Sequence, residues 1–164
     1  MNRRTFTKSL ASDASNSTTT ATEVTGLSLA LPTGNFMFVY YLLVQTSITT
    51  TAVKFAVNHD GTVTKFVYWY YSASATTTAS DGIIDGDISL TTGGLFNVNA
   101  ARAKSTTALT AFVSIDAANA DTLFKVEGIM VVTVAGNLEL WHGSETAAAT
   151  TVLAGSSLVV VKTG

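Results

Sequence analysis

The two histidines are the side chains best suited to acid–base chemistry near neutral pH, and neither has a partner at catalytic spacing. His59 lies in the turn sequence Asn58-His59-Asp60-Gly61, and His142 follows Trp141 at the end of a predicted strand. A hydrolytic triad needs a nucleophile, a base and a group that orients the base, and a metal site needs a second ligand at suitable spacing. The chain has no cysteine. We therefore interpret His59 as a turn residue and His142 as a histidine at a sheet rim, and predict no enzymatic activity and no cofactor.

The sharpest acidic cluster is Asp81-Gly82-Ile83-Ile84-Asp85-Gly86-Asp87. Strand alternation would place Asp81, Asp85 and Asp87 on one face, where three carboxylates could supply oxygen ligands to calcium. The spacing differs from the D-x-[DN]-x-[DN]-G loop, and two isoleucines interrupt it. We favour a solvated, turn-rich sheet edge over a bound cation, and predict no metal site.

A group of aromatic residues offers a different chemistry. Tyr and Trp can stack on sugars, and they are also enriched at protein interfaces, because one end is apolar and the other forms hydrogen bonds. We favour interface packing and keep glycan binding as the alternative. The residues are Tyr68, Trp69, Tyr70, Tyr71 and Trp141.

Composition indicates a subunit of an assembly. Charged residues make up 12% of the chain and apolar residues 47%, with a mean hydropathy of +0.36, whereas soluble domains usually have about 25% charged residues. The net charge of −2 gives no basic footprint for nucleic acid. The longest apolar run, residues 36–44, is far shorter than the roughly 18 residues expected of a spanning helix. We predict no nucleic-acid and no membrane partner.

Short runs of β-branched and aromatic residues, separated by Gly, Asn and Asp, predict a single all-β domain. Their spacing is typical of a sandwich or barrel, and residues 58–61 and 134–137 are expected to form hairpin turns with positive φ. Residues 72–80 are open between loop and strand. The predicted strands are 18–25, 27–31, 36–47, 52–58, 64–72, 82–90, 94–99, 108–116, 122–134, 137–142 and 150–162, the last broken at Gly155.

Two of these strands are apolar on both faces, residues 36–44 and 66–71. One face of such a strand fills the core of a sandwich, and the other must be covered by a partner subunit or by a loop. We favour a partner subunit. Residues 1–16 concentrate positive charge and contain the apolar residues Phe6 and Leu10. We interpret them as an extended arm, with a free tail as the alternative, and residues 17–164 as the domain.

Five stretches resemble a known virion fold. Residues 26–38 combine a Gly-apolar start, a Pro-x-Gly turn and an aromatic strand. Residues 126–129 form an apolar-Glu-Gly strand, residues 135–140 an Ala-Gly turn and strand, and residues 153–161 a Gly-Ser turn into a final strand. Together with the Ser/Thr-rich residues 12–20, they resemble the C1q/TNF-like jelly-roll virion proteins of tailed phages.

The resemblance implies a jelly-roll β-sandwich of two antiparallel sheets that assembles as a homotrimer. It implies a capsid decoration (cement) protein, made in the host cytoplasm and located on the capsid surface, where it contacts the major capsid protein and stabilises neighbouring capsomers. A tail-fibre or receptor-binding, carbohydrate-binding module is the alternative. We expect Arg3, Arg4 and Lys8 of the arm to contact the shell. The expected interface residues are Phe6, Phe36, Phe38, Tyr40, Tyr68, Trp69, Tyr70, Tyr71 and Trp141.

Overall fold

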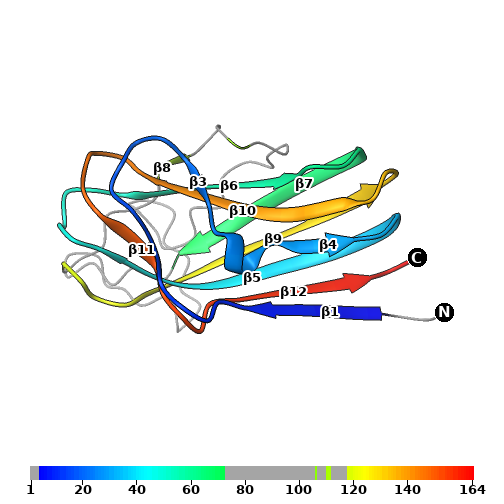
Figure 1. Ribbon diagram of the computed structural model, residues 1–164, viewed down its shortest axis with the longest axis horizontal. Coiled ribbons are helices and arrows are strands. Elements are labelled where there is room, and N and C mark those ends of the chain that lie inside the picture. Colours follow the sequence, from blue (N-terminus) through cyan, green and yellow to red (C-terminus); the bar gives the residue numbers. More distant parts are fainter. Residues whose placement is uncertain (1–3, 73–105, 107–109, 112–117) are drawn as a thin grey trace, which may run out of the picture.

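The computed structural model describes residues 4–72, 106, 110–111 and 118–164, without the side chains of 70–72 and 110–111. The described chain forms strands and a single 3-10 turn, as the sequence predicts (Figure 1). The elements are β1 (Arg4–Ser9), β2 (Ala14–Asn16), β3 (Thr22–Glu23), η1 (Thr25–Leu27), β4 (Leu29–Leu31), β5 (Gly34–Thr46), β6 (Val53–His59), β7 (Val63–Ser72), β8 (Thr110–Ala111), β9 (Thr122–Val132), β10 (Gly136–Ser144), β11 (Thr150–Val152) and β12 (Ser157–Lys162).

The strands form two antiparallel sheets that pack as layers of a sandwich. In sheet A, β5 is central, with β9 and then β7 on one side. Its other side pairs first with β12 and then with β11, which are extended outward by β1 and β2. In sheet B, β10 lies between β6 and the short strands β3 and β4, and β8 extends β6.

The pairs are nested along the chain. β1 pairs with β12, β3 and β4 pair with β10, β5 pairs with β9, and β6 pairs with β8. This is the connectivity of a jelly roll, in which one long folded hairpin wraps into two sheets. The prediction of an all-β sandwich of two antiparallel sheets is confirmed.

The core lies between the sheets and is built from alternate residues of each strand. On β5, the even-numbered side chains point inward, and Phe36, Phe38 and Tyr40 are each at most 1% exposed. Phe124 of β9 meets Phe55 of β6 edge to face, with ring centroids 5.9 Å apart. Each fully buried apolar side chain contributes roughly 1.5–3 kcal/mol, so these large residues are a major source of stability.

The two predicted hairpin turns, residues 58–61 and 134–137, are present at one end of the sandwich, but their glycines do not have the positive φ that was expected. Asp60, after β6, accepts hydrogen bonds from the backbone N–H of Asn137 at 2.5 Å and from its Nδ2 at 2.9 Å. The Asn137 backbone hydrogen bond is the largest cause that lowers the pKa of Asp60. Neither Gly61 nor Gly136 has positive φ. A Cβ on either would collide with the opposite turn, so glycine is required here for close approach.

The N-terminal segment corrects the predicted domain boundary. Residues 4–9, expected in a separate arm, pair along their length with β12, and residues 14–16 pair with β11. Phe6 packs edge to face on Phe36 at 6.4 Å between ring centroids, and Leu10 is 6% exposed. Alternation places these apolar residues against the core, so residues 4–16 belong to the sandwich. The strand predicted over 18–25 is reduced to β3.

Candidate functional site

The side of sheet A turned away from the core carries an apolar surface, which we call the outer face of sheet A. It is made by odd-numbered residues, because side chains alternate along each strand. Its members are Thr5 and Thr7 of β1, Val159 and Val161 of β12, Met37, Val39, Tyr41 and Leu43 of β5, Leu123, Lys125, Glu127, Ile129 and Val131 of β9, and Lys65, Val67 and Trp69 of β7.

Strand register brings the apolar members of this face into rows. Val161, Met37, Ile129 and Val67 are direct cross-strand neighbours on four adjacent strands. Met37 is 54% exposed and Ile129 is 48% exposed. Leu123, opposite Leu43 on the same face, is 49% exposed. Isolated exposed apolar residues are common, but a continuous row across a sheet is typical of an interaction surface.

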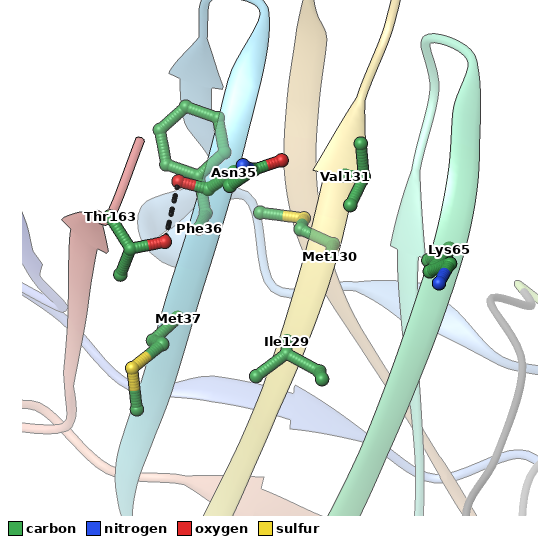
Figure 2. Close-up of a pocket in the computed structure, with 8 residues that line it drawn as sticks. All are labelled: Asn35, Phe36, Met37, Lys65, Ile129, Met130, Val131 and Thr163. Carbon is green, nitrogen blue, oxygen red and sulfur yellow. Dashed lines mark hydrogen bonds between the residues drawn. The ribbon is translucent and has the colours of Figure 1, made fainter.

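A hollow of about 340 Å³ indents one end of this face (Figure 2). Met37, Ile129 and Val131 supply its apolar wall, and Lys65 lies on the neighbouring strand at its rim. On the opposite side, Thr163 donates a hydrogen bond from Oγ1 to the Asn35 carbonyl at 3.3 Å. The hollow is therefore an apolar depression with a polar rim, of a size that an apolar side chain could enter.

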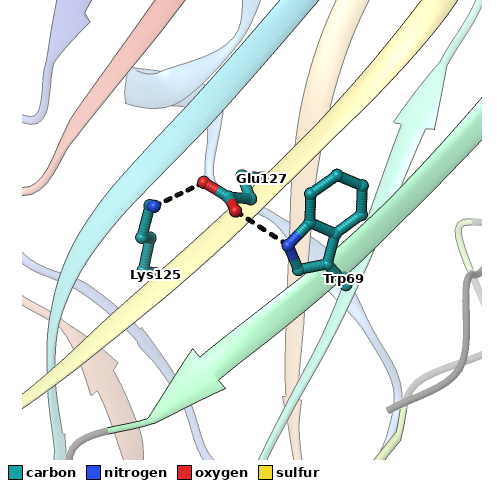
Figure 3. Close-up of polar contacts among 3 residues, drawn as sticks. All are labelled: Trp69, Lys125 and Glu127. Carbon is teal, nitrogen blue, oxygen red and sulfur yellow. Dashed lines mark hydrogen bonds and ion pairs between the residues drawn. The ribbon is translucent and has the colours of Figure 1, made fainter. Parts of the chain in front are cut away.

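Polar groups lie in the middle of the same face. Trp69 Nε1–H donates a hydrogen bond to Glu127 Oε1 at 2.8 Å, and Lys125 forms an ion pair with the other carboxylate oxygen (Figure 3). The Lys125 and Glu127 side chains are 36% and 21% exposed. A polar cluster within an apolar face favours one alignment of a partner over others, because a shifted partner would bury these groups without compensation.

The predicted interface residues are divided by strand alternation. Four of them lie in the core at no more than 1% exposed, so their assignment to an interface is wrong: Phe36, Phe38, Tyr40 and Tyr68. Trp69 lies on the outer face of sheet A. Phe6 is half-buried against the core. Trp141 lies on the outer side of sheet B and donates from Nε1 to Glu139 at 3.0 Å. The side chains of Tyr70 and Tyr71 are outside the described residues.

Sequence reasoning missed the exposed residues of the same strands, above all Met37, Leu123 and Ile129. It selected the aromatic side of residues 36–44, whereas the larger side chains of that strand fill the core. A signal was present in β9, where Lys125 and Glu127 share the parity of Leu123 and Ile129. Charged residues mark the side of a strand that avoids the core.

Both histidines are buried, which corrects their predicted places in a turn and at a rim. His59 is the last residue of β6 and is 0% exposed, and His142 is 1% exposed on the core side of β10. Burial lowers the pKa of His142 from 6.5 to about 4. No hydrogen bond is made by its Nδ1 within the described chain. The His142 ring is therefore neutral at physiological pH and serves as a packing residue.

The described residues contain no cluster of three or more His, Cys, Asp or Glu side chains that could hold a metal ion. Asp81, Asp85 and Asp87, like Arg3, lie outside the described residues. Arg4 and Lys8 are exposed on β1. No described helix has the length and apolar character that membrane crossing requires. Comparison with protein families, with curated proteins and with solved structures finds no match to this chain.

Proposed function

We propose that this protein is a structural subunit that associates with copies of itself through the outer face of sheet A, as a homotrimeric capsid decoration protein of a virion. The observation that carries the proposal is the row formed by Val161, Met37, Ile129 and Val67, which has no cover in the described part of the chain. Exposure of such an apolar row to water is unfavourable in free energy. In a trimer, the row of each copy would be covered by the neighbouring copies around the threefold axis.

Burial of the exposed residues of this face would contribute to association. Full burial of an apolar side chain yields roughly 1.5–3 kcal/mol. Met37, Leu123 and Ile129 are each about half exposed, so covering them yields roughly 2–5 kcal/mol per copy, or about 7–14 kcal/mol per trimer. Each of the two association steps that form a trimer costs an estimated 4–15 kcal/mol. The three residues therefore offset part of that cost, and the partly exposed valines of the face add to the gain.

Composition supports the same proposal. Only 12% of residues are charged, and a surface rich in Thr and Ser loses little when a neighbouring subunit removes its water. The placement on a capsid is supported by the sequence resemblance to tailed-phage virion proteins. In that role, the trimer would bridge neighbouring capsomers and raise their stability by mass action.

Sedimentation velocity of the purified chain at micromolar concentration tests the association, and we expect a trimer. Electron microscopy of tailed-phage particles with and without added protein tests the capsid role, with density on the outer shell as the expected result. A monomer would refute the association. A trimer that leaves the shell bare would refute only the capsid role.

A receptor-binding module of a tail fibre is the second candidate, favoured by Trp69 beside Glu127 and Lys125. An indole next to hydrogen-bonding groups is a common surface for sugars. Binding to a glycan array that is lost in Trp69→Ala, with the trimer intact, would favour this candidate over decoration.

A further inference from the structure

β1 is an edge strand of sheet A. It pairs with β12 on one side, and no described segment pairs with its other side (Figure 1). In an antiparallel ladder, every second residue of an edge strand directs its N–H and C=O groups away from the sheet. The free side of β1 therefore presents a row of backbone donors and acceptors, the template that an added strand uses.

The side chains of this edge are basic. Arg4, Phe6 and Lys8 share one face of β1, and the strand contains no acidic residue. Lys162 lies directly opposite Arg4 on β12 and adds another cation. Within the described chain, no ion pair joins Arg4, Lys8 or Lys162 to a carboxylate. Three of the nine Lys and Arg residues of the chain are therefore at this edge, Arg4, Lys8 and Lys162.

The apolar residue between the two cations is also accessible. Phe6 is half-buried, with its ring against Phe36 on one side and the Arg4 guanidinium 5.8 Å from its centroid on another. An apolar side chain placed opposite Phe6 by a further strand would extend the core by one residue. Like charges directly opposite destabilise a strand pair, so β1 disfavours pairing with the β1 of a second copy.

We propose that the free edge of β1 accepts an extended segment of a partner protein with the pattern acidic-x-apolar-x-acidic. The alternation of the segment places its two carboxylates opposite Arg4 and Lys8 and its apolar residue opposite Phe6. The pattern is the same in both chain directions, so parallel and antiparallel addition both satisfy it. The assignment of this segment to a capsid protein rests on the proposed function. The binding of such a segment to β1 can be measured without a capsid.

The test uses the full chain and a capped peptide, Thr-Glu-Thr-Val-Thr-Glu-Thr, followed by amide NMR and hydrogen exchange. We expect shifts and slowed exchange confined to β1 and its neighbour β12. Arg4→Glu combined with Lys8→Glu should weaken binding roughly ten-fold, from two reversed cross-strand pairs. Lys54→Glu, a charge reversal on β6 in sheet B, is the matched control and should change binding less than about two-fold.

Two altered peptides separate strand addition from charge attraction. A peptide N-methylated on every amide from the first Glu to the second keeps its charge but has no central N–H to donate on either edge. The peptide Thr-Thr-Glu-Glu-Val-Thr-Thr places its carboxylates on opposite faces. Both should bind at least ten-fold more weakly. Equal binding by either, or no response of β1 at millimolar peptide, would overturn the proposal. Sedimentation of the same samples reports self-association separately, so failure of the edge site is distinguishable from failure of the trimer.

Discussion

Replacing Ile129 with lysine tests whether the outer face of sheet A joins copies of the chain. Ile129 is 48% exposed in the row that includes Met37 and Val67. Burial of its exposed half is worth roughly 0.7–1.5 kcal/mol per copy, or about 2–4 kcal/mol per trimer. Because a lysine ammonium must also be desolvated or expelled, we expect a loss of at least about 3 kcal/mol, more than a hundred-fold in the dissociation constant.

Ile48→Lys is the matched control. Ile48 is 42% exposed in the turn after β5, outside the strands that form the outer face of sheet A. The assay is sedimentation velocity across a concentration series, with thermal unfolding to check that each variant folds. We expect Ile129→Lys to sediment as a monomer where the wild type and Ile48→Lys are trimers. If Ile129→Lys and the wild type have the same oligomeric state at every concentration, the outer face is not the interface.

Three further predictions concern stability. Because the pKa of His142 is lowered in the folded state, the unfolded chain binds a proton more readily than the folded chain between pH 6.5 and about 4. The free energy of unfolding should therefore fall as the pH is lowered through this range, by about 3 kcal/mol in total. Denaturant titrations should show a weaker pH dependence in His142→Gln. Gly136→Ala should lower the free energy of unfolding by more than 2 kcal/mol, because the new Cβ would collide with the opposite turn. Gly155→Ala should lower it by about 1 kcal/mol, because the site has open space but a φ of +90°. In unfolding experiments, Phe38→Ala should lower the free energy of unfolding by about 3–5 kcal/mol. Met37→Ala, one residue away but exposed, should lower it by less than about 1 kcal/mol. Similar losses for the two variants would contradict the assignment of Phe38 to the core and Met37 to the outer face.

The sequence was sufficient to predict most strands because β-branched and aromatic runs end at clear turn residues. The break at Gly155 and the strand over residues 36–47 were predicted to within two residues. Both have local signals in the sequence: a glycine, which can adopt positive φ, and a long apolar run. β1 was missed because Arg4–Ser9 contains only one apolar residue. Its strand conformation depends on pairing with β12, from which it is separated by most of the chain.

The candidate surface was predicted only in part. The need for a second cover over residues 36–44 follows from two apolar faces, which is a property of the strand alone. Which face is buried depends on the position of sheet B, and no residue within that run reports it. The same limitation affected His142, whose burial follows from its pairing opposite Phe55 on the core side of β10. Predictions that depended on the partner strand were therefore the ones that failed.

The pairing of β1 with β12 has a consequence for synthesis. Arg4 lies opposite Lys162, so one edge of sheet A cannot form until nearly all of the described chain has left the ribosome. Folds dominated by such distant contacts form slowly, in milliseconds to seconds, because the entropy cost of closing a long loop comes before the favourable free energy of strand pairing. Until then, β1 and the edge of β5 that pairs with β12 are exposed to other nascent chains. The rate at which β1 closes the sheet should therefore set the yield of properly folded protein during high-level expression.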